Sequence, residues 1–275
     1  MKRVLVLSLL ALASCARLSP SSDSLVEWTF DAPATKASLG DGGAFSWDKG
    51  DKIAVWDASG GTFVPFESKT GSGRFSATAP AGSRFSQLAL FPVTIAAGST
   101  ASVTVPSSYS AASLEGGAGI LMHAAVEDGS NVLHFKHLGA YLTVNVKDAP
   151  SSVEQVILSS PEAALSGNFA LAASGSAMQI SASSGTGVIT VSCPHTDGQD
   201  VSFTIPVPVG RYNINVTAKD GSGEEKLSVH TSAGVSFDRA HKYTLETATV
   251  EGAALVLLSG VCEPYGTASD DDNWK

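Results

Sequence analysis

Three observations predict that this chain folds as an all-β protein. Short segments rich in β-branched and aromatic residues follow one another along most of the sequence, separated by glycine, proline and serine. Apolar and polar residues alternate strictly in segments such as 142–146, which is the period of a half-buried strand. Apolar residues at helical spacing are scarce. These features favour antiparallel β-sandwiches, and for a chain of this length two sandwiches of roughly 120 and 100 residues are favoured over one.

The segment 1–15 has the layout of an export signal. Lys2 and Arg3 supply positive charge, residues 4–12 are apolar, and two small residues then precede Cys15. A secretory signal does not need a cysteine at its cleavage site, but this arrangement resembles a bacterial lipobox. In such a lipoprotein, Cys15 carries acyl chains such as palmitate and becomes the new N-terminus. The alternative is a plain signal peptide with an incidental cysteine.

An acylated Cys15 would hold the mature chain on a membrane. Each buried methylene group of an acyl chain contributes about 0.8 kcal/mol to membrane binding, so several chains anchor a protein firmly. No later apolar run reaches the roughly 18 residues that a spanning helix needs. Residues 16–24 are polar and rich in serine, as expected of a tether. The chain is therefore expected to be extracytoplasmic and held on the membrane by lipid.

Residues 25–148 form the first predicted unit. Residues 45–47 lead through a glycine-containing turn into the strand 52–56, so a hairpin is expected there. Residues 107–120 are rich in serine, alanine and glycine and are expected to form a loop. The expected strands span residues 25–30, 52–56, 61–66, 73–77, 87–91, 102–105, 121–126, 132–138 and 140–146.

Residues 149–249 form the second predicted unit, after a boundary at a segment that contains proline and serine. The alternation of apolar and polar residues is clearest between residues 210 and 218. The expected strands span residues 153–159, 164–170, 178–181, 188–191, 201–207, 210–218, 226–230 and 241–246. The tail, residues 250–275, differs in composition, because an apolar run at 253–258 precedes an acidic end.

The charge of the chain argues against a nucleic-acid partner. The formal net charge is -9 and the isoelectric point is near 5.0, so the chain lacks the basic footprint that phosphate backbones require. An acidic surface also gains nothing from anionic lipid headgroups. The expected membrane link is therefore the lipid alone.

Two cysteines remain if Cys15 is acylated. An extracytoplasmic compartment permits a disulfide bridge between Cys193 and Cys262. The alternative is two separately buried thiols, because a sequence does not show whether two Cα atoms come within bonding range. His195 follows Cys193 closely, but near neighbours in sequence rarely form the thiol–base pair of a catalytic site.

The sequence carries no motif of a catalytic, cofactor or metal site. It lacks the G-x-S-x-G, H-E-x-x-H and P-loop patterns. His134 and His137 lie in one expected strand at a spacing that points them to opposite faces, which is unfavourable for a shared metal. The aspartates near the C-terminus are expected to be a solvated charge run rather than a calcium site. We therefore expect no enzyme and assign no catalytic residue, cofactor or metal ligand.

The tryptophans permit two interpretations. Trp47 and Trp56 flank a predicted turn and strand, where they would fill the interior of a sandwich. Exposed indole rings also stack on sugars in many carbohydrate-binding sandwiches. The alternative function is therefore a surface glycan-binding lipoprotein that uses Trp47 or Trp56.

Several stretches taken together resemble the fimbrillin-like proteins of Bacteroidales. Residues 45–56 carry a Trp-x-x-Gly-Asp-x-Ile core after a loop with a basic residue. Residues 133–144 are similar to the family's Phe-x-His-x-x-Ala strand, and residues 165–169 and 237–245 resemble motifs that come later in the family's sequences. The resemblance covers roughly residues 25–249, and the order of the motifs is more specific than any motif alone.

The resemblance implies two transthyretin-like Greek-key β-sandwich domains in tandem and a role in type V pili. In such pili the precursor travels as an outer-membrane lipoprotein, and a protease cuts after a basic residue in the N-terminal domain. The first strand is removed, and a donor strand from a neighbouring subunit enters the groove. The physical basis is that an added strand satisfies both the unpaired backbone and the apolar pockets of an opened sandwich.

Mapped onto this sequence, residues 25–30 would be the displaced strand and Lys36 the processing site. Ala253, Leu255 and Leu257 would belong to the donor strand. Arginine is common where this chain has Lys36, so an uncut chain that keeps its lipid and acts as an anchor is the alternative. The implied partners are other fimbrial subunits by strand addition, the outer membrane through the lipid, and a host or bacterial surface ligand. The implied location is the cell surface, or the fimbrium after processing.

Overall fold

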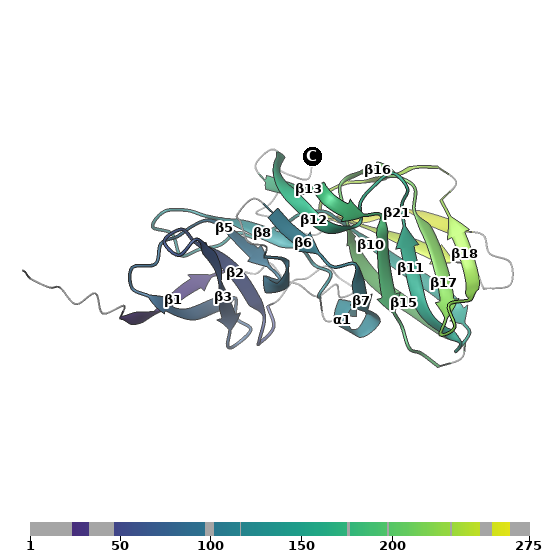
Figure 1. Ribbon diagram of the computed structural model, residues 1–275, viewed down its shortest axis with the longest axis horizontal. Helices are drawn as coiled ribbons and strands as arrows, with labels where there is room; N and C mark the ends of the chain where they lie inside the picture. Colours follow the sequence, from purple (N-terminus) through teal and green to yellow (C-terminus); the bar gives the residue numbers. More distant parts are fainter. Residues whose placement is uncertain are drawn as a thin grey trace, which may run out of the picture.

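The structure, a computed structural model, describes residues 24–32, 47–96, 102–115, 117–174, 177–196, 198–231, 233–247 and 255–264, the last of these as backbone only. Nearly every element within these residues is a β-strand, so the predicted all-β fold is confirmed. A seven-stranded sheet lies at the N-terminal end of the elongated molecule and a two-sheet sandwich at the other end (Figure 1). A three-stranded sheet lies between them.

The N-terminal sheet curls around a core that is rich in aromatic rings. Phe30, Phe66, Phe75 and Phe91 reach this core from four of its strands and are almost completely buried. An isolated bridge between Asp31 and the segment before the last strand brings the two edges of the sheet together at one point. In spatial order the strands are β1 (Leu25–Asp31), β4 (Arg74–Pro80), β3 (Thr62–Ser68), β2 (Lys52–Asp57), β5 (Phe85–Phe91), β8 (Met122–Val126) and β9 (Lys136–His137).

The C-terminal sandwich encloses a core of mainly aliphatic side chains, to which Leu142, Val144 and Val146 contribute. Its first sheet consists of β15 (Gln199–Val207), β10 (Ala140–Ala149), β20 (His241–Thr247) and β21 (Leu255–Pro264). Its second sheet consists of β18 (Glu225–His230), β17 (Asn215–Asp220), β11 (Val153–Ser159), β14 (Val188–Ser192) and β7 (Ser108–Ser110). The short helix α1 (Ala111–Glu115) lies against β15, and β16 (Gly210–Tyr212) pairs with β19 (Val235–Phe237).

A third core joins the N-terminal sheet to the middle sheet. Ala54, Leu88 and Leu90 face away from the aromatic core and pack with Val103 and Phe169 of the middle sheet. The middle sheet consists of β13 (Ala177–Thr186), β12 (Ser166–Ser174) and β6 (Ser102–Val105), and the 3-10 turn η1 (Val93–Ile95) lies beside it. Strands β2 and β5 are therefore covered on both faces.

The expected boundary near residue 148 does not separate these sheets and is corrected by their topology. β6, β7 and β10 all precede that residue, yet β6 pairs with β12, β7 pairs with β14, and β10 pairs with β15 and β20. The reason is physical: backbone pairing joins strands that are distant in sequence, and composition near residue 148 carries no information about partners. The predicted ranges 25–148 and 149–249 therefore share strands across their sheets.

Three local expectations also differ from the structure. The segment 107–120, expected to be a loop, contains β7 and α1. The segment 210–218 is divided into β16 and β17, which belong to different sheets. Trp47 lies outside any strand, and β2 pairs with β3 and β5, so the hairpin expected at 45–56 is wrong within the described residues. No helix in the described part of the chain is long and apolar enough to cross a membrane.

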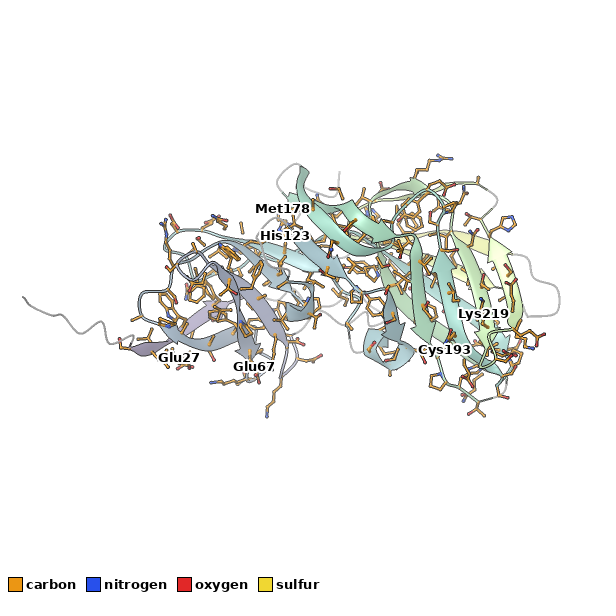
Figure 2. The ribbon with its side chains drawn as sticks, viewed as in Figure 1. Glu27, Glu67, His123, Met178, Cys193 and Lys219 are labelled. Carbon is orange, nitrogen blue, oxygen red and sulfur yellow. The ribbon has the colours of Figure 1, made fainter. Side chains whose placement is uncertain are left out.

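A pair of buried histidines lies where the N-terminal sheet meets the middle sheet. Nε2 of His123 accepts a hydrogen bond from the Met178 backbone N–H at 3.0 Å, and the two residues lie side by side in Figure 2. Nδ1 of His137 lies 2.6 Å from the Tyr141 hydroxyl oxygen. Burial, followed by the charge of Arg239, lowers the pKa of His123 to about 4. Burial likewise lowers the pKa of His137 to about 3. Both rings are therefore neutral parts of the interior at neutral pH.

Candidate strand-exchange site

Strand β1 lies at one edge of the N-terminal sheet and pairs with a single strand. All of its residues pair with β4, from Leu25 opposite Pro80 to Asp31 opposite Arg74, without a register shift. On its other edge, among the described residues, β1 pairs only at Asp31, which forms the isolated bridge with Val132. An edge strand leaves a sheet after losing one set of ladder hydrogen bonds, whereas a central strand must lose two.

Backbone hydrogen bonds hold the C-terminal end of β1 on both sides. The Asp31 N–H donates to the carbonyl oxygen of Asn131 at 2.7 Å, and the Asp31 carbonyl accepts from the Leu133 N–H at 2.8 Å. The Ala32 N–H donates to the carbonyl oxygen of Gly73 at 2.7 Å. Release of β1 therefore has to break contacts with two other segments as well as the ladder with β4.

The inward side chains of β1 become more buried along the strand. Val26 is 37% exposed and Phe30 only 4%, while Trp28 is half-buried between them. The Phe30 ring centroid lies 5.2 Å from that of Phe66, and the Trp28 centroid lies 5.1 Å from that of Phe85, both in edge-to-face contact. We call the space that these β1 side chains fill, beside β4 and against Phe66 and Phe85, the β1 slot.

Trp47 holds the chain at the point where β1 ends. Its Nε1–H donates to the Ala32 carbonyl oxygen at 3.0 Å, and its ring is 4% exposed. The ring makes edge-to-face contacts with Phe75, Phe91 and Phe135, at centroid distances of 4.8, 5.2 and 5.4 Å. One side chain thus links the end of β1 to the centre of the aromatic core.

Gly73 allows the turn between β3 and β4 to approach the same point. Its φ is +80°, a left-handed conformation that strains other residues. A Cβ atom there would also collide with the Ala32 carbonyl oxygen and the Trp47 ring. The end of β1 therefore needs glycine at this position.

Strands β3 and β4 diverge beside β1 and leave a groove of about 330 Å³. They pair only at Glu67 with Ser76 and at the next pair along the hairpin. Val64 and Phe66 contribute apolar atoms to the lining, and Glu27 and Glu67 lie on the same side of the N-terminal sheet (Figure 2). The outer face of the sheet is thus open next to the strand that occupies its edge.

Two ion pairs lie on this face. Lys69 Nζ lies 3.7 Å from a Glu27 carboxylate oxygen and so connects the β3–β4 turn to β1. Lys52 Nζ lies 3.5 Å from a Glu67 carboxylate oxygen and connects β2 to β3. All of these side chains are about half exposed or more, so each pair contributes little to stability.

The arrangement is suited to exchanging one strand for another. Removing β1 would expose one edge of β4 and the apolar walls of the β1 slot. Unpaired strand edges and apolar pockets at alternate positions are the two features that a strand-addition site uses, the first for affinity and the second for specificity.

Most predicted processing and attachment residues lie outside the described residues. This holds for Cys15, Lys36 and Ala253. Leu255 and Leu257 lie in β21, where their backbones pair with β20 at the edge of the C-terminal sandwich. The predicted donor segment is therefore also an edge strand, of the chain's own sandwich.

Among the described side chains, Cys193 does not form a reactive site. Its thiol is buried, with 2% exposure of the residue, and burial raises its pKa to about 11. His195 lies with Nδ1 2.9 Å from the Cys193 carbonyl oxygen rather than beside the thiol. A neutral buried thiol without an adjacent base is a poor nucleophile. The side chain of Cys262 lies outside the described residues, so a bridge between the two cysteines stays a prediction.

Trp47 cannot form the sugar platform of the alternative function, because its ring is buried and its N–H is already bonded to Ala32. Trp56 is half-buried, with its ring in edge-to-face contact with Phe63 at 5.2 Å. The structural interpretation of Trp47 is therefore correct. Within the described residues no group of three or more His, Cys, Asp or Glu side chains is placed to hold a metal ion.

The resemblance points to the strand that fills the slot but not to the groups that hold it. The carbonyl oxygen of Asn131, the turn at Gly73 and the ion pair to Lys69 come from segments distant in sequence. The glycines of residues 71–73 were the one available signal, because they mark a turn with special backbone angles.

Comparison with solved structures identifies the fold. A candidate cell adhesion protein from Bacteroides ovatus matches 85% of this chain and 96% of its own, with a TM-score of 0.53 and 11% sequence identity. The tip fimbrial protein Mfa3 from Porphyromonas gingivalis covers 85% of this chain and 99% of its own at 11% identity, with a TM-score of 0.36. The fimbrial anchor protein Mfa2 from the same organism covers 86% and 98% at 9% identity, with a TM-score of 0.35.

No family model matches the chain, and no curated protein sequence matches it. The fold of the Bacteroides ovatus protein is thus shared at a sequence identity of only 11%.

Proposed function

We propose that this chain is a non-enzymatic component of cell-surface fimbriae, either a subunit or its membrane anchor, that assembles by strand exchange at the β1 slot. The observation that supports this most strongly is the position of β1. It is an edge strand near the start of the chain, and its aromatic side chains complete the N-terminal core. The likeness in fold to a candidate cell adhesion protein supports the same assignment.

The proposed attachment site and the proposed processing site lie at the two ends of the segment that contains β1. Acylation of Cys15 would hold the chain on the outer membrane, and cleavage after Lys36 would separate that lipid from the rest of the molecule. Both sites lie on opposite sides of β1 in sequence, so one cut would release β1 together with the lipid. A cut chain would be a subunit, and an uncut chain would be an anchor.

Mass spectrometry of the mature N-terminus on cells tests this choice. An N-terminus near Ala37 supports a polymerising subunit, and an acylated Cys15 supports an anchor. An N-terminus at neither place, in a protein found away from the cell surface, would contradict the proposal.

The tail supplies the second half of the proposed assembly. Residues 253–258 would leave the edge of the C-terminal sandwich and enter the slot of a neighbouring subunit of a different kind. Cells that produce the chain without residues 250–275 should then carry fimbriae that lack this protein, as immunogold electron microscopy would show. Normal incorporation of the shortened chain would exclude the tail as donor.

A further inference from the structure

We infer that the β1 slot selects a strand with two large aromatic side chains at alternate positions, flanked by acidic residues. The geometry points to a segment of a different protein as its occupant, and not to the tail of a second copy of this chain. This inference rests on the strand exchange proposed above and names the partner of that site.

The first argument is the size of what fills the slot. Phe30 contacts both Phe66 and Phe85, at centroid distances of 5.2 and 6.0 Å. Trp28 packs against Phe85 and also donates its Nε1–H to the Pro80 carbonyl oxygen at 3.3 Å. An aliphatic side chain at either position would leave unfilled space and lose these ring contacts, and the indole N–H has no aliphatic substitute.

The second argument is charge. Lys69 lies 3.7 Å from Glu27, which immediately precedes Trp28. Arg74 lies directly opposite Asp31, which immediately follows Phe30. Lys69 and Arg74 therefore lie near the two ends of the aromatic pair; Glu27 forms an ion pair with Lys69, and Asp31 is the register partner of Arg74. A strand without acidic residues at these two positions would lose the ion pair with Lys69 and place an uncharged residue opposite Arg74.

The third argument is that the predicted donor part of the chain's own tail lacks both features. Residues 255–261 contain no aromatic and no charged residue. Two aromatic residues separated by one residue occur at only two places in the sequence, Trp28 with Phe30 and Phe45 with Trp47. Trp47 is already part of the same core as Phe30. Among the segments of this chain, β1 alone therefore carries the pattern that the slot accommodates.

The consequence is an assembly between unlike proteins. A second copy offers either its own β1, which already completes its own core, or a tail that fits the slot poorly. A partner of matching chemistry would carry one extended segment of five residues in the order acidic, aromatic, any, aromatic, acidic. Such a partner would exclude self-polymerisation through this slot.

A competition experiment on the full mature chain tests the inference. A specific protease site is placed between residues 33 and 46, and the chain is cut so that the β1 segment remains bound without a covalent link. Fluorescently labelled peptide 24–32 is then allowed to exchange into the slot. The unlabelled competitors are the same peptide, its Trp28→Leu/Phe30→Leu variant, its Glu27→Gln variant, and the tail peptide 254–264.

We expect the unaltered peptide to compete best. The double leucine variant and the tail peptide should each compete at least about tenfold more weakly, because they leave the ring pockets unfilled. The Glu27→Gln variant should compete about twofold more weakly, and only at low salt, because the pair with Lys69 is exposed. Equal competition by the tail peptide, or by the leucine variant, would overturn the inference and leave strand exchange standing.

Failure of the unaltered peptide 24–32 to enter the slot would instead contradict strand exchange itself, and the inference with it. A second measurement does not depend on exchange. In the uncut chain, residues 25–31 are replaced by the sequence of residues 255–261, and amide hydrogen exchange is followed in β4. We expect at least about tenfold faster exchange in β4 than in the unaltered chain. Unchanged protection of β4 would overturn the selectivity for aromatic side chains.

Discussion

The two ends of the molecule bury cores of different kinds. In the described residues, seven of the 16 buried core residues of the N-terminal sheet are aromatic, against four of 26 in the C-terminal sandwich. The N-terminal core therefore depends on a few large side chains, one of which, Phe30, comes from an edge strand. The C-terminal core depends on many small contributions, and strands with two neighbours, such as β10 and β11, supply a large share of them. Loss of a single large side chain is therefore expected to weaken the N-terminal core more than loss of one side chain weakens the C-terminal core.

Low pH should have the largest effect, because it should destabilise the N-terminal sheet more than the C-terminal sandwich. Among the described histidines, only His123 and His137 are buried, and both belong to the N-terminal sheet. Their pKa values, lowered from 6.5 to about 4 and about 3, mean that the unfolded chain takes up protons before the folded one does. Stability therefore falls as the pH drops from about 6.5 to about 4, by about 3 kcal/mol for each ring, since one pKa unit corresponds to about 1.4 kcal/mol.

Hydrogen exchange at pH 7 and pH 4 measures this effect. We expect β8 and β9 to lose protection at pH 4 before β11 and β17 do. Lys136 and Arg239 place positive charge near the two rings, and this charge further opposes their protonation. His123→Gln should flatten the pH dependence, whereas His134→Gln, at an exposed position, should not. Equal loss of protection in both units would contradict the assignment of the acid sensitivity to the buried pair.

Truncating Phe30 should have the next largest effect. Phe30→Ala removes a ring with 4% exposure, and changes of this kind cost about 3–5 kcal/mol. We expect β4 and β5 to exchange their amide hydrogens much faster, while β11 and β17 keep most of their protection. Thr29→Ala, on the outer face of the same strand, is the matched control and should change stability little. A uniform loss of protection over the whole chain would show that the two cores unfold as one unit.

The sequence predicted the strands well because the signal for a strand is local. Alternation and β-branched residues placed the strands at 102–105 and 153–159 where the structure has them. The partners of the strands are not local. β10 pairs in parallel with β20, which lies about a hundred residues later, and nothing in the composition of either strand indicates the other.

The site was predictable to the same extent and for the same reason. Residues 25–30 are expected to form a strand, and the structure places that strand at the edge of a sheet. Its role as the displaced strand comes from the family resemblance alone. The sequence left open whether Trp47 fills a core or binds a sugar, because a tryptophan suits both. Its partner, the Ala32 carbonyl, is a backbone group, and a backbone group carries no signature in sequence.

Removing the indole N–H of Trp47 should loosen the end of β1 while keeping most of the core. Trp47→Phe leaves the carbonyl of Ala32, a residue with 1% exposure, without this hydrogen bond, and an unsatisfied buried group costs about 1–3 kcal/mol. We expect a lower denaturant midpoint and faster release of β1 in the cut chain. Trp56→Phe, at a half-buried ring, is the control. Equal effects of the two substitutions would show that ring size, not the hydrogen bond, matters at residue 47.

Removing the ion pair between Lys69 and Glu27 should have the smallest effect, and this effect should be confined to the release of β1. Both side chains are mostly exposed, so Lys69→Gln should cost less than about 1 kcal/mol and the cost should vanish in high salt. Lys52→Gln breaks a similar pair between β2 and β3, neither of which leaves in the proposed exchange. Faster release of β1 from the cut Lys69→Gln chain at low salt, with no change for Lys52→Gln, would show that charge at the slot acts on the mobile strand itself. The same rate for both variants would mean that the pair between Lys69 and Glu27 does not help to hold β1 in place.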